Sequence, residues 1–276
     1  MKHFFALLIL FNVYVTASAQ YLHLNLAFGT TNYSGDLQPA RYTFQQSHAA
    51  VALGLSYDVS EKFSIRSQIT LGKISGHDKF NPATAVRNLN FTSSLSELHI
   101  AGEYYLRDLS EHSLSPYIFG GIAVYHFNPF TKDTTGNTYF LQPLSTEGQG
   151  FFGDRKSYKL TQIAIPFGAG IKLAISENIR IGIEVGMRKA FTDYLDDLST
   201  TYVDPTLLAA NRGPKAVELA YRENELKNNV PYQTGANRGG AKYKDWYYFT
   251  GFTTSIRLGS GGGRSRANLG CPTRIN

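Results

Sequence analysis

Eight segments of the chain alternate between apolar and polar residues, and the connections between them are in turn long and short. The short connections are Asp58–Lys62, Arg107–Ser115 and Ser176–Asn178. The long, polar connections are Thr30–Gln46, Ile74–Ser94, Asn128–Ser157 and Phe191–Lys244. Alternation with a period of two residues is typical of β-strands, because successive side chains of a strand point to opposite faces. The pattern predicts an all-β fold of eight antiparallel strands.

The seventh segment shows the two faces most clearly. Apolar side chains occupy every second position from Ile179 to Met187, and the positions from Arg180 to Arg188 between them carry arginine, glutamate and glycine. Six or seven of the eight segments follow this pattern, whereas 116–127 is apolar at both sets of positions and its faces stay unassigned. A β-sandwich would turn the apolar face to a core, and a membrane barrel would turn it to lipid. Alternation alone leaves both folds open.

The N-terminal residues, the loop lengths and the charges on the inner face, described below, together decide between these folds. Met1–His3 is basic, Phe4–Thr16 is apolar, and Ala17-Ser18-Ala19 has the small residues of a cleavage site, so we expect residues 1–19 to be a signal peptide. Outer-membrane barrels have short periplasmic turns and long external loops. We therefore predict an eight-stranded antiparallel transmembrane β-barrel over residues 20–258, in the outer membrane of a Gram-negative bacterium.

The composition agrees with this prediction. Charged residues make up 17% of the chain, against about 25% in soluble domains. Aromatic residues make up 13%, and the 18 tyrosines suit the border between hydrocarbon and lipid headgroups. The formal net charge of +6 falls to +5 once Lys2 leaves with the signal peptide, but the positive residues are dispersed. We therefore expect no nucleic-acid partner.

Charged residues of both signs fall on the face that would point into the barrel. They are Arg66, Glu97, Glu103, Lys172, Arg180, Glu184, Arg188 and Arg257. Eight strands enclose a lumen just wide enough for side chains to fill it, and buried charges are costly unless they are paired. We expect these charges to form a structural network in a packed lumen that conducts nothing. A proton or ion path is the functional alternative.

No residue pattern indicates catalysis, a metal or a cofactor. His77, His99, His112 and His126 lack the spacing of metal ligands, and the chain has no Gly-x-Ser-x-Gly motif or phosphate-binding loop. We expect His99 to be a lumen residue that bonds to a neighbouring carboxylate. The sequence thus predicts a protein that is not an enzyme. A barrel-embedded lipid-modifying enzyme is the less favoured alternative, since nothing in the sequence places a serine beside a base.

The longest connection carries four aspartates close together, namely Asp193, Asp196, Asp197 and Asp204. Clustered carboxylates can bind calcium, but the spacing of an EF-hand is absent, so a solvated acidic loop is the favoured interpretation. Further along, Pro205–Lys227 predicts a short external helix with mostly exposed charges. Whether the connection folds over the barrel mouth or faces another protein stays open.

Residues 259–276 follow the last strand as a glycine-rich, basic tail, which an even strand count places in the periplasm. The tail contains Cys271, the only cysteine of the chain. A lone cysteine in a secreted protein indicates an intermolecular disulfide or a free thiol. Our hypothesis is that Cys271, with Arg264 and Arg266, binds a periplasmic partner; an incidental exposed thiol is the alternative.

Five stretches carry a family resemblance. They are Gly29–Leu37, Ser115–Gly121, Phe127–Pro129, Ile165–Lys172 and Thr192–Ser199. In this order they resemble the PorG-type (DUF6089-like) outer-membrane barrel of the type IX secretion and gliding machinery of Bacteroidota, over most of the mature chain. The sharpest blocks are Tyr-Ser-Gly-Asp, which begins at Tyr33, and Thr-Asp-Tyr-Leu-Asp-Asp, which begins at Thr192.

The resemblance implies a non-enzymatic component that associates, from the outer membrane, with a periplasmic ring formed by a lipoprotein and its partner. The expected surroundings are outer-membrane lipids around the barrel and the ring at the Cys271 tail, with an intermolecular disulfide as one form of that contact. A passive envelope barrel or adhesin-like protein that acts through its external loops is the main alternative.

Overall fold

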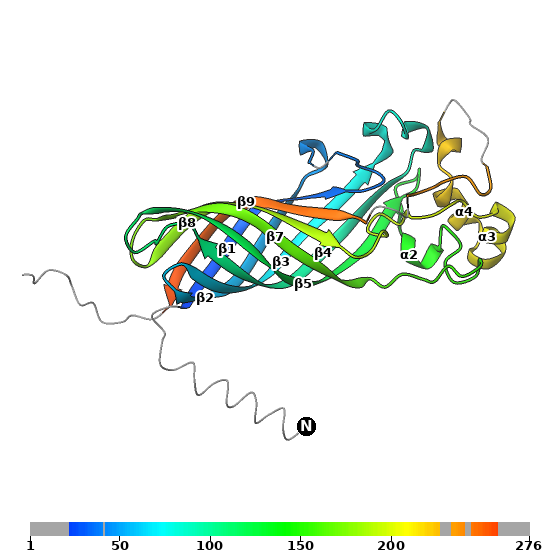
Figure 1. Cartoon of the computed structure of the whole chain (residues 1–276). Coiled ribbons are helices and arrows are strands. Elements are labelled where there is room, and N and C mark those ends of the chain that lie inside the picture. The colour runs from blue at the N-terminus through cyan, green and yellow to red at the C-terminus, as the bar shows by residue number, and fades with distance from the viewer. Residues whose placement is uncertain (1–21, 41, 227–232, 241–243, 259–276) are drawn as a thin grey trace, which may run out of the picture.

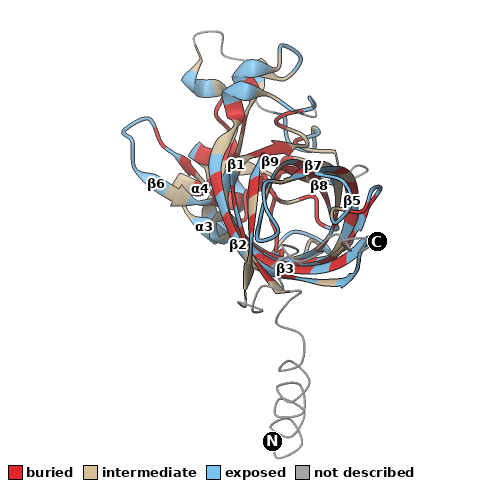
Figure 2. Ribbon diagram, turned by 90° about the vertical axis from the view of Figure 1, so that its left-hand side faces the viewer, coloured by how far each residue is buried: buried red, intermediate tan, exposed pale blue. Residues whose placement is uncertain are grey.

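The computed structural model describes residues 22–40, 42–226, 233–240 and 244–258. Eight long strands form a barrel in which each strand pairs antiparallel with its neighbours, and β1 pairs with β9 to close the ring (Figure 1 and Figure 2). The strands are β1 (Leu22–Ser34), β2 (His48–Ser60), β3 (Phe63–His77), β4 (Asn90–Tyr105), β5 (Leu114–Lys132), β7 (Thr161–Ala174), β8 (Ile179–Ala190) and β9 (Trp246–Leu258). The predicted eight-stranded antiparallel barrel is confirmed.

The remaining elements lie in the long connections. They are η3 (Phe44–Gln46), η4 (Asp78–Phe80), η5 (Ala85–Arg87), β6 (Thr138–Phe140), α2 (Leu141–Leu144), α3 (Pro205–Arg212), α4 (Pro214–Ala220) and η6 (Glu223–Glu225). Within the described ranges, no helix is both long and apolar enough to cross a membrane. The single helix expected over Pro205–Lys227 is wrong, because Gly213, with a φ of +83°, ends α3 and a proline then starts α4.

Buried and exposed residues alternate along the strands (Figure 2), as β3 and β5 show most regularly, so successive side chains face the lumen and the outside in turn. On β3, Ile69 and Leu71 are half-exposed, whereas Arg66 on the other face is buried. The structure also assigns the faces of the segment 116–127 in β5, where Tyr117 points inward and Ile118 outward. The apolar positions of the sequence pattern therefore cover the outside of the ring, and the polar positions fill its interior.

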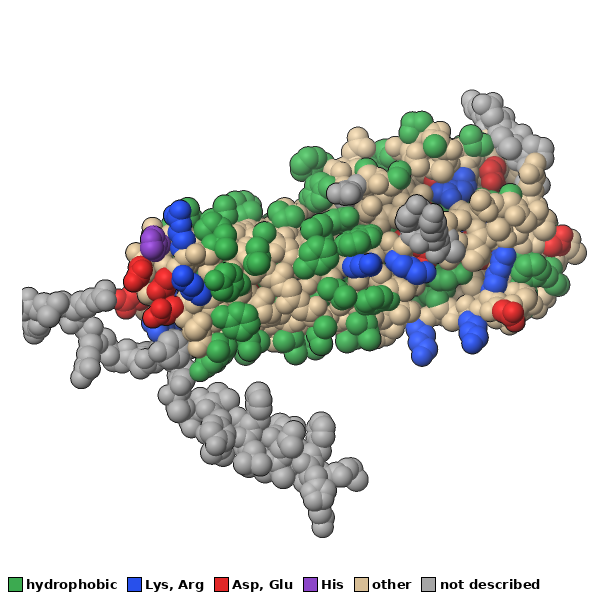
Figure 3. Space-filling model, in the orientation of Figure 1, with side chains coloured by type: hydrophobic (Ala, Val, Ile, Leu, Met, Phe, Trp, Pro, Cys, Tyr) green, Lys and Arg blue, Asp and Glu red, His purple; other side chains and the backbone are tan. Residues whose placement is uncertain are grey.

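The outward-facing apolar side chains form a belt around the middle of the barrel, with charged side chains towards its ends (Figure 3). Towards the long connections this belt ends at exposed polar residues such as Lys73, His126 and Lys189. A water-soluble surface would rarely expose so large an apolar area. A closed barrel leaves no strand edge unpaired, so the ring can lie in hydrocarbon with the belt facing lipid.

The strands reach further at the long-connection end than the sequence predicted. β3 runs to His77, β4 begins at Asn90 and β5 runs to Lys132, all within connections expected to be polar loops. Beyond the belt the pattern inverts, because Ile74 and Phe127 now point inward and are buried. These inward side chains contribute to a hydrophobic core above the membrane, and the polar outer positions made the extensions resemble loops.

Candidate functional site

Two groups of ion pairs cross the lumen. In the first group, Arg66 on β3 lies 2.7 Å from Glu184 on the opposite strand β8 (Nη1–Oε2) and 2.9 Å from Glu103 on β4 (Nη1–Oε1). Lys172 on β7 lies 2.6 Å from Glu103 (Nζ–Oε2). Two phenols donate hydrogen bonds of 2.6 and 2.7 Å to these carboxylates, those of Tyr105 and Tyr117. This group therefore connects five strands across the barrel, namely β3, β4, β5, β7 and β8.

The second group lies nearer the long connections and centres on Glu97 of β4. Arg188 on β8 lies 3.2 Å from this carboxylate (Nε–Oε2), and the Tyr247 hydroxyl on β9 donates to it at 2.7 Å. His99 Nδ1 lies 2.8 Å from Glu97 Oε1, which is the histidine–carboxylate contact expected from the sequence. All four side chains are buried.

Charges in the two groups balance. The buried cations Arg66, Lys172 and Arg188 match the three buried carboxylates. The Phe119 ring lies between the groups, with the Arg66 guanidinium 5.0 Å from its centroid. Gly168 makes room for this ring, because a Cβ there would lie 2.8 Å from it. A filled lumen with paired charges offers no continuous path for an ion.

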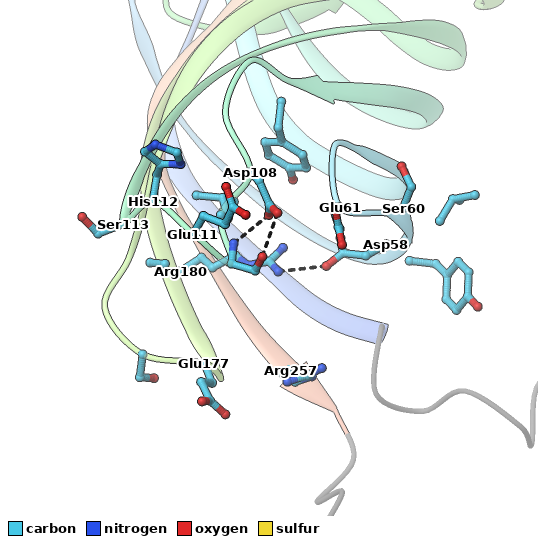
Figure 4. A pocket seen from close by; sticks show the side chains of 17 residues that line it. Asp58, Ser60, Glu61, Asp108, Glu111, His112, Ser113, Glu177, Arg180 and Arg257 are labelled. Carbon is cyan, nitrogen blue, oxygen red and sulfur yellow. Dashed lines mark hydrogen bonds and ion pairs between the residues drawn. The ribbon is translucent and has the colours of Figure 1, made fainter. Parts of the chain in front are cut away.

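The other two predicted lumen residues lie at the short-turn end. Arg180 on β8 is 2.9 Å from Asp58 on β2 (Nη2–Oδ2), and His23 lies 3.0 Å from the same carboxylate oxygen. Arg257 lies near the end of β9, is partly exposed and lines the opening of the barrel (Figure 4). The eight predicted residues therefore divide into six in the lumen and two at this mouth.

The long-connection end is closed by a cap, which we define as residues 133–160 and 191–200 with the helices α3 and α4. The Tyr33 hydroxyl donates to Asp196 at 2.5 Å and to Asp245 at 3.3 Å. Leu195 is fully buried in a hydrophobic core that strands from several sides of the barrel also line. Residues 191–200 of the connection 191–244, whose place the sequence left open, thus fold into the barrel mouth. The helices α3 and α4 belong to a second hydrophobic cluster and lie beside the ring (Figure 2).

The two sharpest blocks of the family resemblance meet in this cap. Tyr33 belongs to the first block and Asp196 to the second, and their hydrogen bond joins positions 163 residues apart. Gly35 of the first block is required by close approach, because a Cβ there would lie 2.1 Å from both the Tyr33 hydroxyl and Asp245 Oδ1. These motifs therefore contribute to closing the external mouth.

The expectation of a solvated acidic loop is wrong for three of its four aspartates. Asp193, Asp196 and Asp197 are buried. Asp197 accepts hydrogen bonds from Tyr158 (2.8 Å) and from Thr146 (2.5 Å). The partners that make burial tolerable come from distant segments, which the local sequence does not show. Asp204 caps α3 instead.

Burial changes the protonation of these carboxylates. It raises the pKa of Asp193 to about 7 and that of Asp197 to about 6. Burial, followed by repulsion from neighbouring carboxylates, holds the pKa values of Asp196 and Asp245 well above the usual range. Across the residues with assigned structure, no group of three or more His, Cys, Asp or Glu side chains could hold a metal ion, so the calcium alternative gains no support.

The short-turn end opens into a pocket of about 800 Å³ (Figure 4). Its lining includes five acidic and two basic residues, namely Asp58, Glu61, Asp108, Glu111, Glu177, Arg180 and Arg257. Hydrogen bonds from the Ser110 amide and hydroxyl hold Asp108 in its turn and lower the pKa of its carboxyl. Three exposed glutamates, one from each short turn, make no ion pair with any residue of the described chain. By the convention for outer-membrane barrels, this mouth faces the periplasm.

One contact contradicts the expectation that no serine lies beside a base. Ser75 Oγ on β3 is 2.7 Å from His48 Nε2 on β2, and both residues are partly exposed near the external border of the belt. A catalytic histidine also needs a group that orients its other nitrogen. Among the residues placed by the structure, no carboxylate or amide bonds to the other ring nitrogen of His48.

Several predicted residues have no described structure. The signal peptide, residues 1–19, and the tail, 259–276, with its partner-binding candidates Cys271, Arg264 and Arg266, lie outside the described residues.

Comparisons with solved structures find barrels of low sequence identity. Neisserial surface protein A from Neisseria is 8% identical with a TM-score of 0.45, covering 86% of this chain and 97% of that one. Ail of Yersinia pestis is 8% identical with a TM-score of 0.39, covering 85% and 97%. OprG of Pseudomonas aeruginosa is 12% identical with a TM-score of 0.39, covering 86% and 96%. No curated protein sequence matches the chain.

A family model gives a further match. The model described as "Domain of unknown function (DUF6089)" matches residues 2–204, which include strands β1 to β8 and the first part of the connection that follows.

Proposed function

The chain belongs to the DUF6089 family and is a small outer-membrane β-barrel protein, and from this premise we propose that it anchors the periplasmic ring of a type IX secretion system. The proposal assigns the barrel a non-enzymatic role in holding a secretion and gliding assembly to the membrane. Its support is the motif resemblance found in the sequence together with the contrast between the two ends of the barrel.

The contrast between the ends is the observation that carries the proposal. The external end is closed by the cap, and paired charges fill the lumen, so passage of a solute is not favoured. The periplasmic end has an open pocket with exposed charges, and Leu22 and Leu258, the first and last barrel residues described, pair beside each other there. A periplasmic partner can therefore reach the exposed charges of this pocket.

The chemistry of the mouth favours a partner with a basic surface. Glu61, Glu111 and Glu177 come from three different turns and are exposed. Each exposed ion pair contributes only about 0.2–1 kcal/mol, and salt weakens it. The mouth alone would give a weak, orienting contact, and a disulfide at Cys271 would make the attachment durable.

The test is to purify the tagged full-length protein from native outer membranes under non-reducing conditions and to identify its partners. We expect periplasmic ring proteins to be recovered and to be released by reductant or by Cys271→Ser. The triple variant Glu61→Lys, Glu111→Lys, Glu177→Lys should lower recovery, whereas Asp154→Lys, an exposed carboxylate in the cap, should not. If the parent barrel is recovered without ring proteins, and neither Cys271→Ser nor the triple glutamate variant changes what is recovered, anchoring is overturned. The passive envelope barrel is then favoured.

The Ser75–His48 contact favours the barrel-embedded lipid hydrolase as a second candidate. Here Ser75 would be the nucleophile and His48 its base. Release of fatty acid from phospholipid vesicles by the purified barrel, abolished in Ser75→Ala while the barrel remains folded, would support it. No release above the Ser75→Ala level would exclude this candidate.

A further inference from the structure

Phe44, in the connection between β1 and β2, is 88% exposed and is the most exposed large hydrophobic side chain in the described part of the chain. Its ring meets the Tyr42 ring edge-on, with the centroids 5.6 Å apart. Two aromatic rings on one short segment form an apolar surface that water solvates poorly. A surface of this kind is expected to be covered by lipid or by another molecule.

The segment that displays these rings is firmly held. The buried Asn32 side chain donates hydrogen bonds to the Thr43 carbonyl (2.6 Å) and to Ser47 Oγ (2.8 Å). Gln38, also buried, donates to Asn32 Oδ1 at 2.6 Å and accepts from the Thr43 hydroxyl at 3.1 Å. Because side chains of β1 and its following turn fix both ends of 43–47, the exposure of Phe44 belongs to the folded structure.

The position of the segment identifies its surroundings. Tyr42 Oη lies 2.9 Å from Thr30 Oγ1, and Thr30 comes two residues after Phe28 on the outer face of β1. Phe28 is 62% exposed within the apolar belt and pairs with Phe252, which is 67% exposed. Tyr42 and Phe44 therefore lie beside the external border of the belt, where the blue connection after β1 projects sideways from the barrel in Figure 1.

We propose that Tyr42 and Phe44 insert into the outer leaflet at the border between acyl chains and headgroups, as a lateral membrane anchor separate from the barrel wall. The continuity of their surface with the belt argues for lipid as the occupant. Aromatic rings concentrate at this depth because their apolar part is buried while polar edges and hydroxyls reach hydrated groups. The anchor would fix the external connection to the bilayer surface and limit rotation of the barrel about an axis in the membrane plane.

Depth-dependent fluorescence quenching tests the proposal. Trp246, the only tryptophan, is replaced by phenylalanine, and Phe44→Trp is introduced as the reporter in the full-length chain. The protein is reconstituted in phosphatidylcholine vesicles whose acyl chains carry bromine either near the headgroup or near the chain end. We expect quenching of the Phe44→Trp reporter by both lipids, and more strongly by bromine near the headgroup.

A matched control is Phe152→Trp in the same background, since Phe152 is an exposed aromatic residue of the cap. It should remain unquenched by either lipid and accessible to acrylamide. Heat-dependent migration in detergent gels verifies that each variant is folded. A folded Phe44→Trp protein that bromine does not quench would overturn the proposal. The proposal would also be overturned if the Phe44→Trp reporter became protected from acrylamide only when the protein density in the vesicles is raised. A second copy of the chain would then cover this surface.

Discussion

The membrane-embedded part of the barrel and the core beneath the external cap are built on opposite rules, although the same strands line both. Within the belt, the inner positions of β3 include Arg66, whereas beyond the belt the inner position Ile74 is apolar. On β4, Glu97 and Phe91 show the same inversion. In lipid, an apolar exterior is stable and the polar side chains face the interior. In water, a polar exterior is stable and the apolar side chains face the interior. The place where polarity inverts along a strand therefore marks the membrane surface.

The difference also divides the sources of stability. The interior of the barrel depends on paired charges, where the loss of one partner leaves the other buried and unpaired. The cap depends on a hydrophobic core, where the loss of a side chain leaves a cavity. If the two regions are energetically separate, variants in one should leave the other unchanged.

The largest effect is expected from Arg66→Met, which removes the cation between Glu103 and Glu184. The barrel should lose about 3–5 kcal/mol of unfolding free energy, because two buried carboxylates lose a partner. Urea unfolding in lipid vesicles measures this loss. Arg180→Met, at the partly exposed mouth, is the matched control and should cost less. Equal losses in the two variants would contradict a special role for the buried network.

A smaller and local effect is expected from Leu195→Ala in the core of the cap. The cavity should destabilise the cap by about 2–5 kcal/mol. Hydrogen exchange of the 191–200 amides should accelerate, while the amides of β7 and β8 within the belt stay protected. If the barrel strands also lose protection, the cap and barrel form one cooperative unit and the division drawn above fails.

The smallest effect is a dependence of cap stability on pH. The pKa of Asp193 is about 7 and that of Asp197 about 6 in the folded cap, both raised from 3.8 by burial. The closed cap therefore binds more protons than the open cap between about pH 4 and pH 7. The contribution of these two aspartates to cap stability is fully present below about pH 4 and is lost as pH rises through 6 to 7. Hydrogen exchange of 191–200, corrected for the intrinsic pH dependence, should show weakening that Asp193→Asn reduces; a flat profile in the parent protein would refute it.

The sequence was informative where one rule held along a whole segment. Period-two alternation located the barrel strands and placed Arg66, Glu97 and Glu184 on the inner face. It failed where the solvent changes along a strand: the extension of β5 to Lys132 reads as a polar loop because Asn128, Pro129, Thr131 and Lys132 break the alternation. The alternation carries no information about which solvent lies outside.

Contacts between distant segments were the other limit. From the local sequence Asp196 and Asp197 look solvated, because the Tyr33 and Tyr158 hydroxyls that donate hydrogen bonds to them lie far away in sequence. The Ser75–His48 contact was missed for the same reason, since it depends on the path of β2 beside β3. Residue spacing predicts local faces well and says little about which side chains converge from separate strands.

The hydrogen bond from Tyr33 to Asp196 and Asp245 has a consequence for biogenesis. It joins a residue of the first strand to positions 163 and 212 residues later, which lie in the connection between β8 and β9. Contacts of such long sequence separation form late, because the intervening chain must already be in place. This contact can therefore form only after β9 has paired with β1. An ordered cap is thus a sign, on the external surface, that the barrel has closed.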